Sequence, residues 1–340
     1  MRIKLCGLIA CVAMLAAGIV SCQQHDDIPQ DVKYPILFDS PDTRATATKD
    51  DLKANGFRVW AYITNTTVEN HLLMENQLVE YDESEDKWFY SPVEYWLDNT
   101  VFTFVGVYPY DENGTYYSLD AANAAVKLTV DETPSEVDFL IAKNTTDTKV
   151  EGYSPTVDLP FQHVLTSVGL NIWRDQGKHQ NDDMRIKSVT LGNIIKSGVY
   201  SSATGSWTNN NNDKLTLEML DEDLTDSDNI GAVTVKDDGS LDAGGDKPAS
   251  PFGEMMLLPQ TLDDSNVVSL KIVYELKRNN AADWEEAELE AVLPSITWKA
   301  GQRYTYNVVL SSVTDITVYY IQTKVDPWGT PQVGGTVIIK

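Results

Sequence analysis

Alternating apolar and polar positions run through most of this chain, and they predict β-strands. In residues 57–63, the side chains of Phe57, Val59, Ala61 and Ile63 would share one face of a sheet. The same alternation marks four later segments: 164–173, 268–277, 287–293 and 304–310. Residues 101–108 are almost entirely apolar, which predicts a strand buried on both faces. Because long helical periodicity is absent, we predict an all-β chain of antiparallel sandwiches or barrels.

One short helix is expected before the first of these strands. Thr48 has the position of an N-cap with Asp51 three residues later, and Gly56 lies where a helix would end. Two further features organise the chain. Two prolines in 154–160 indicate a boundary between two halves, and the polar segment of about 201–249 predicts long surface loops or disorder.

The N-terminus carries the one long apolar run. Two basic residues precede an apolar segment over 5–20, which is typical of a secretory signal and is shorter than the roughly 20 residues of a membrane-spanning helix. Residues 19–22 have the form of a bacterial lipobox ending at Cys22. We therefore predict a signal peptide over 1–21 and a lipid on Cys22, the alternative being an ordinary signal with an incidental cysteine. Cys6 and Cys11 lie inside the signal, so no disulfide framework is expected.

Charge and motifs exclude several classes of function. The net charge of −25 argues against nucleic acid and against electrostatic attraction to anionic membranes. The four histidines lack metal-ligand spacing, and neither a G-x-S-x-G elbow nor a phosphate-binding glycine loop occurs. We predict no catalytic residue, no metal and no cofactor, and hence no enzyme. His163 is interpreted as a structural histidine.

Two local patterns leave alternatives open. Residues 226–231 resemble the start of a calcium loop, but Ile230 and Asp237 replace two of the usual ligands, which favours a solvated acidic loop. Trp88 and Trp96 belong to an aromatic cluster that could stack on a glycan. Packing in the fold is the favoured interpretation of both tryptophans.

The arm over 22–45 contains an apolar patch that a simple tether would not need. The patch spans 34–38, and its centre, Ile36, Leu37 and Phe38, predicts a strand that docks elsewhere. Thr43-Arg44-Ala45 follows as a polar segment with a basic centre. At the other end of the chain, a glycine pair precedes a short β-branched strand that includes Val337, Ile338 and Ile339. This terminal strand could complete its own sheet or pair with another chain.

Taken in order, these features resemble the fimbrillin family, the subunits of type V pili of Bacteroidales. The similarity spans nearly the whole chain and rests on seven segments: the lipobox, the arm with Arg44, 56–62, 88–96, 101–109, 159–165 and 298–306. The resemblance implies two transthyretin-like antiparallel β-sandwich domains in tandem, over 46–158 and 159–340.

The resemblance also implies a mechanism of assembly. The precursor would be exported as a lipoprotein to the outer membrane and cell surface, and cut between Arg44 and Ala45 by a protease whose identity stays open. Loss of the arm strand at Ile36, Leu37 and Phe38 would open a groove for a strand from another fimbrial subunit. The candidate donor strand comprises Val333, Val337, Ile338 and Ile339. The implied function is a structural subunit of a fimbria that serves in adhesion; the alternatives are a monomeric surface lipoprotein that binds glycans or host ligands, and a surface enzyme without a recognisable site.

Overall fold

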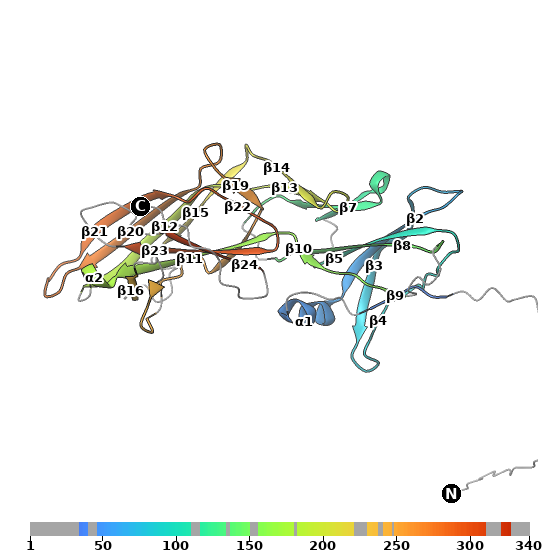
Figure 1. Cartoon of the computed structure of the whole chain (residues 1–340), viewed down its shortest axis with the longest axis horizontal. Helices are drawn as coiled ribbons and strands as arrows, with labels where there is room; N and C mark the ends of the chain where they lie inside the picture. The colour runs from blue at the N-terminus through green and yellow to red at the C-terminus, as the bar shows by residue number, and fades with distance from the viewer. Residues whose placement is uncertain are drawn as a thin grey trace, which may run out of the picture. The chain divides into compact units, whose positions relative to one another are not determined.

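Strands make up most of the fold. The computed structural model of the chain describes residues 34–39, 46–109, 116–133, 137–149, 156–179, 182–220, 230–236, 241–246, 248–310 and 321–327 (Figure 1). The helical elements in this part of the chain are short: α1 (Thr46–Asn55), the 3-10 turn η1 (Ala121–Asn123) and α2 (Gln176–His179). The prediction of an all-β chain is therefore confirmed.

The first sheet is antiparallel throughout. Its six strands lie in the order β10 (Gln162–His163), β8 (Leu140–Asp147), β5 (Val101–Tyr108), β2 (Phe57–Thr64), β3 (His71–Asp82) and β4 (Lys87–Phe89). The central strands β2 and β5 match the segments predicted at 57–63 and 101–108. Both are mostly buried, because apolar cores cover the two faces of the sheet there.

The predicted helix forms as α1 and ends at a glycine. Gly56 follows Asn55 with φ of +71°, a conformation that side chains with a Cβ atom rarely adopt, and its N–H donates to the carbonyl of Leu52 at 2.8 Å. A Cβ atom at position 56 would lie 2.6 Å from the backbone oxygen of Val79. Glycine is therefore required both by the turn and by the close approach of β3.

We expect Gly56→Ala to lower the free energy of unfolding by about 2 kcal/mol, because strain at positive φ adds to the clash with Val79. Gly244→Ala is the matched control. It also places alanine at positive φ, +55°, but nothing lies within 4 Å of its Cβ position. Urea unfolding of the two variants measures the difference, and equal losses would show that the close approach at Gly56 has no energetic effect.

Two further sheets enclose the largest apolar core. One contains β17 (Leu241–Asp242), β16 (Ala232–Val235), β11 (Thr166–Asp175), β23 (Gln302–Leu310) and β24 (Ile321–Pro327), with β18 (Glu254–Leu257) beside β11. The other contains β15 (Lys214–Leu220), β12 (Asp183–Ile195), β20 (Ser269–Lys277) and β21 (Glu285–Val292). Buried between them, the indole N–H of Trp298 donates to the Tyr306 hydroxyl at 2.8 Å.

Not all strand pairs in this region are antiparallel. The eight-residue pairing of β11 with β23, from Ser167 opposite Arg303 to Arg174 opposite Leu310, is parallel. The short contact of β11 with β16 is parallel as well. The prediction of antiparallel sheets holds for most of the fold and fails where strands pair in parallel, as β11 does with β23, which lies far along the chain.

A smaller sheet combines strands from both halves of the chain. It has the order β14 (Ser206–Asn209), β13 (Gly198–Ser201), β7 (Ala125–Val130) and β6 (Tyr117–Asp120). Two short pairs complete the fold: β19 (Gln260–Leu262) with β22 (Ile296–Trp298), and β1 (Leu37–Phe38) with β9 (Thr156–Val157). The division into domains 46–158 and 159–340 stays a prediction.

The prediction of long surface loops over 201–249 is wrong for much of that segment. It contains β14, β15, β16 and β17. In β15, the partly buried side chains of Leu215, Leu217 and Met219 alternate with exposed ones and pack against the main core. The abundance of polar residues concealed this alternation.

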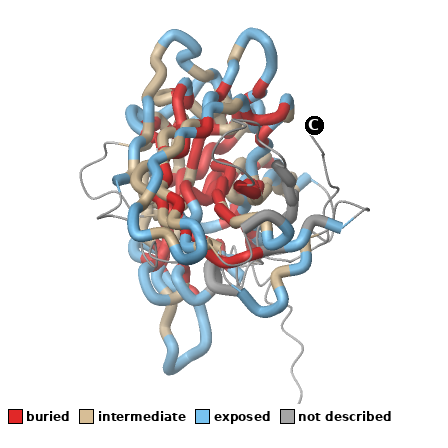
Figure 2. Tube along the Cα trace, turned by 90° about the vertical axis from the view of Figure 1, so that its left-hand side faces the viewer, coloured by how far each residue is buried: buried red, intermediate tan, exposed pale blue. Residues whose placement is uncertain are grey.

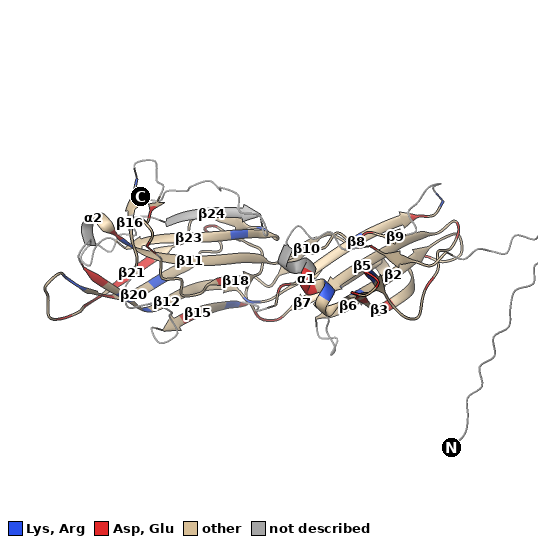
Figure 3. Cartoon of the chain, turned by 90° about the horizontal axis from the view of Figure 1, so that it is seen from below, with Lys and Arg blue, Asp and Glu red and all other residues tan. Residues whose placement is uncertain are grey.

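Buried residues lie mainly in the sheets, and charged residues are distributed over the described strands. Figure 2 shows buried residues concentrated inside the layers and exposed residues at the loops. Acidic and basic positions are interspersed along the described strands (Figure 3). Within the described ranges, none of the helices has the length and apolar character needed to cross a membrane.

Candidate functional site: the docked arm strand

The arm segment 34–39 lies in the fold as an added strand. Its residues Leu37 and Phe38 form β1, which pairs in parallel with β9 at Thr156 and Val157. The N–H of Asp39 donates to the carbonyl of Val157 at 3.0 Å. One edge of this apolar patch is thus hydrogen-bonded to β9.

The opposite edge of the arm is hydrogen-bonded too. The N–H of Ile36 donates to the carbonyl of Glu94 at 2.9 Å, and the N–H of Trp96 donates to the carbonyl of Tyr34 at 3.0 Å. An antiparallel bridge joins Pro35 to Tyr95 between these bonds. The arm therefore occupies the space between β9 and residues 94–96, and we call this arrangement the arm site.

Two side chains of the arm enter the apolar core. Ile36 is fully buried and Phe38 is 6% exposed, and both belong to the core that also contains Phe57 and Phe104. The Phe38 ring meets the rings of Phe57, Tyr90 and Phe104 edge-on, with centroids 6.1, 5.5 and 6.0 Å away. Burying two side chains of this size stabilises the docked state by about 1.5–3 kcal/mol each.

A buried phenol also holds the arm in place. The Tyr90 hydroxyl donates to the carbonyl of Ile36 at 2.9 Å and accepts from the N–H of Glu94 at 3.2 Å. Tyr90 thereby links the arm to its neighbouring segment. Burial raises the pKa of the Tyr90 hydroxyl from 10.0 to about 12, because an ionised phenolate would lose its hydration there.

This pKa predicts that the protein loses stability at high pH. Since the folded pKa is the higher one, folded Tyr90 keeps a proton between about pH 10 and 12 that the unfolded chain loses, so the free energy of unfolding falls as pH rises through this window. Tyr90→Phe cannot ionise, and we expect its stability to fall less between pH 9 and 11. At pH 7 the variant should lose about 1 kcal/mol with the Ile36 hydrogen bond. Urea unfolding at each pH measures both effects, and an unchanged slope would contradict the assignment.

Trp88 and Trp96 contribute to the core beneath the arm. Their exposed fractions are 6% and 7%. Trp88 packs against Phe57 at 4.9 Å between ring centroids, and Trp96 against Phe102 at 4.7 Å. A sugar cannot stack on a ring covered in this way, so the packing interpretation is the one that the structure supports.

The outward face of the arm site is apolar as well. More than half of the large apolar side chains that are exposed in the described part of the chain gather on three segments here: Tyr34 and Leu37 on the arm, Phe89 on β4, and Val93, Tyr95 and Leu97 after it. Their exposed fractions run from 40% to 57%. Apolar surface concentrated in this way is typical of a site of protein association.

Other predicted site residues lie outside the described residues. They are Cys22, Arg44, Ala45, Val333, Val337, Ile338 and Ile339. Part of the calcium-like loop, including Asp226 and Asp237, also lies outside them. Their predicted roles remain predictions.

The remaining polar groups show no catalytic arrangement in the described ranges. Nδ1 of His163 lies 2.7 Å from Oδ2 of Asp138. This hydrogen-bonded contact agrees with the interpretation of His163 as a structural histidine. Among the described residues, no three or more His, Cys, Asp or Glu side chains lie together in a way that could hold a metal ion.

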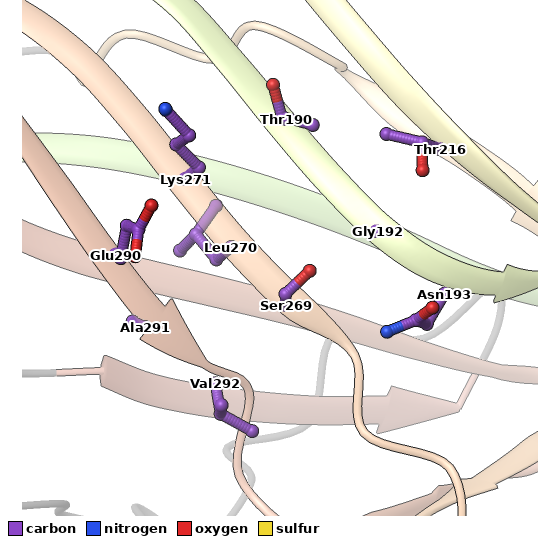
Figure 4. A pocket seen from close by; sticks show the side chains of 10 residues that line it. All are labelled: Thr190, Gly192, Asn193, Thr216, Ser269, Leu270, Lys271, Glu290, Ala291 and Val292. Atoms are coloured by element: carbon purple, nitrogen blue, oxygen red, sulfur yellow. The ribbon is translucent and has the colours of Figure 1, made fainter.

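A shallow depression of about 680 Å³ lies on the sheet of β12, β15, β20 and β21 (Figure 4). It is lined by hydroxyl groups, by Lys271 and Glu290, by apolar side chains, and by Gly192, where a Cβ atom would lie 2.5 Å from the hydroxyl oxygen of Ser269. Nζ of Lys271 forms an ion pair with Glu288 at 2.8 Å, which raises the pKa of the lysine. Since its cation is already paired, this depression offers little to a ligand.

One comparison with known proteins identifies a family. A family model described as fimbrillin-like matches residues 43–328. No curated protein matches the chain. Among solved structures, a fimbrial protein from Bacteroides vulgatus is 18% identical, with a TM-score of 0.65, over 86% of this chain and 99% of that one. A candidate cell adhesion protein from Bacteroides uniformis is 16% identical, with a TM-score of 0.48, over 88% of this chain and 99% of that one.

Proposed function

The chain belongs to the fimbrillin-like family, and from this we propose that it is a fimbrial subunit that serves in adhesion. We further propose that it is exported as a lipoprotein precursor with lipid on Cys22. It then assembles with other fimbrial subunits by donor-strand exchange, at the outer membrane and cell surface. No catalytic role is included in the proposal.

The docked arm strand is the observation that carries this proposal. The arm contributes two core side chains and hydrogen bonds on both edges, yet it precedes the body of the fold in the chain. A cut after Arg44 falls between the arm strand and α1, so no covalent bond would hold the arm afterwards. Its departure would expose apolar side chains and unpaired backbone groups of β9 and 94–96, which favours the addition of a new strand.

The C-terminal segment is the proposed source of that strand. Val337, Ile338 and Ile339 form three consecutive apolar residues, as do Ile36, Leu37 and Phe38 in the arm. A strand that leaves one subunit and enters the next makes a head-to-tail contact that does not close on itself, so repetition produces a filament. The lipid on Cys22 would leave with the arm, and would then serve delivery of the precursor instead of permanent attachment.

Limited proteolysis tests the proposal directly. Trypsin at low dose should release the arm from the purified precursor, produce a new N-terminus at Ala45, and be followed by a ladder of multimers on a non-boiled gel. Arg44→Gln should prevent both events, whereas Arg44→Lys, which trypsin still cuts, should preserve them. If protein trimmed at Ala45 stays monomeric, the alternative of a monomeric surface lipoprotein is supported instead.

A further inference from the structure

A polar pocket lies away from the arm site, between two turns. It has a volume of about 450 Å³ and opens between the turn that joins β14 to β15 and the turn that joins β19 to β20. Ile195 is the only apolar residue in its lining. Amides and one amine dominate: Asn209, Asn211, Asn212, Lys214, Gln260 and Asn266. We call these six residues and the space between them the amide pocket.

Hydrogen bonds hold one wall of the amide pocket in a defined arrangement. Gln260 is only 5% exposed, and its Oε1 accepts from the N–H of Ile195 at 3.3 Å and from Nδ2 of Asn266 at 3.2 Å. Nδ2 of Asn266 also donates to the carbonyl of Thr261 at 2.9 Å. The amide of Asn266 is therefore oriented with its oxygen toward Lys214, whose Nζ donates to it.

Lys214 is a cation without a counter-ion in the described part of the chain. Among the described residues it forms a hydrogen bond with Asn266 and no ion pair, although the sequence contains 51 acidic residues. Burial lowers the pKa of its amine. Since an ammonium group carries three N–H donors, two remain for another acceptor in the pocket.

The rim adds both donors and acceptors. The exposed amides of Asn211 and Asn212 form no hydrogen bond with a described residue. Across the pocket, Oδ1 of Asp263 accepts from Ser265 N–H at 2.8 Å and from Asn266 N–H at 3.1 Å, so it stabilises the turn. Oδ2 of Asp263 has no such partner within the described ranges and can accept a hydrogen bond from a ligand.

We propose that the amide pocket binds a neutral saccharide. Each sugar hydroxyl both donates and accepts, and the pocket places a donor amine, an acceptor carboxylate and five amides around one space. An apolar ligand would bury these groups without hydrogen bonds, which is unfavourable. The volume lies within the roughly 300–1,000 Å³ of small-molecule sites, enough for one or two sugar rings.

The composition of the lining also sets the expected affinity. Among the described residues, no aromatic ring lines the pocket, so stacking does not contribute, and we expect a dissociation constant of about 1–10 mM for a single site. Many copies along a filament would raise the apparent affinity by about 100-fold or more toward a surface with many sugars. That last step rests on the proposed function, whereas binding by one subunit does not.

Binding should be measured on the intact monomeric precursor, so that the result is independent of fimbrial assembly. Saturation-transfer NMR with the methyl glycosides of glucose, galactose, mannose and N-acetylglucosamine provides four neutral probes, and methyl glucuronide provides an acidic one. We expect saturable binding of at least one neutral probe. Lys214→Met should weaken it at least tenfold, and so should Asn211→Ala combined with Asn212→Ala.

Two controls distinguish loss of binding from general effects of substitution and from misfolding. Lys143→Met removes an exposed lysine outside the pocket and should leave binding unchanged. The asparagine variant changes only exposed side chains, so its thermal unfolding should match that of the unmodified protein even if Lys214→Met folds poorly. The proposal is overturned if no neutral probe binds, if only the glucuronide binds, or if the pocket variants bind as the control does.

Discussion

Removal of the arm is expected to lower the free energy of unfolding by about 5 kcal/mol or more, because it deletes a buried isoleucine and a buried phenylalanine from one core. The variant that tests this begins at Ala45 and ends at Gln332, so that the candidate donor strand cannot refill the space. Its thermal unfolding should occur at least about 10 °C below that of the precursor. An arm that contributes little to stability would leave the two unfolding temperatures alike.

Substitutions at two neighbouring residues of the arm test whether the loss of stability comes from docking or from any substitution in the arm. Ile36 is fully buried and Leu37 is 47% exposed, although both are large and aliphatic. Ile36→Ser should cost about 3 kcal/mol or more, and Leu37→Ser within about 0.5 kcal/mol. Similar losses from both variants would mean that the arm does not dock with this alternation.

Rescue in trans distinguishes a strand that can be exchanged from one that only completes the fold. A synthetic peptide of residues 34–39 should raise the unfolding temperature of the arm-less variant in proportion to its occupancy, because it binds the folded state alone. The same peptide with Ile36→Ser should have little effect. If neither peptide stabilises the variant, the arm site does not accept a separate strand.

Local pattern was sufficient to predict several of the strands and the alternation of the arm, although it missed the strands within 201–249. The apolar run at 101–108 and the alternation at 57–63 correspond to β5 and β2, because both depend on residues close together in the chain. The burial of Ile36 and Phe38 around exposed Leu37 follows the same period of two. The side chains that a strand buries can thus be predicted from the alternation in its own sequence.

The strands with which these segments pair could not be predicted from local sequence. Nothing near the arm indicates that it pairs with β9 or with residues 94–96, since these contacts join distant parts of the chain. The parallel pairing of β11 with β23 has the same origin. The amide pocket was missed because its residues come from two separate turns and the strand ends beside them, and asparagines in a turn are usually explained by backbone conformation alone.

Deletion of residues 333–340 is expected to abolish assembly of the trimmed protein while leaving the precursor folded. The proposed donor strand is then absent, so a trimmed subunit has no strand to insert into the arm site of the next subunit. Multimers on a non-boiled gel after trypsin treatment should fall below about one hundredth of the unmodified yield, which corresponds to a loss of roughly 3 kcal/mol in favour of assembly. The thermal unfolding of the untrimmed variant provides the control for folding.

Single substitutions in the donor strand then test how it binds. Successive side chains of a strand point to opposite faces, so Val337 and Ile339 share one face and Ile338 occupies the other. If the strand replaces the arm, one face must enter the space that Ile36 and Phe38 leave, and the other must remain at the surface, as Leu37 does. Aspartate should therefore block assembly either at both 337 and 339 or at 338 alone. Equal inhibition at all three positions would indicate non-specific apolar association, because only an inserted strand discriminates between its two faces.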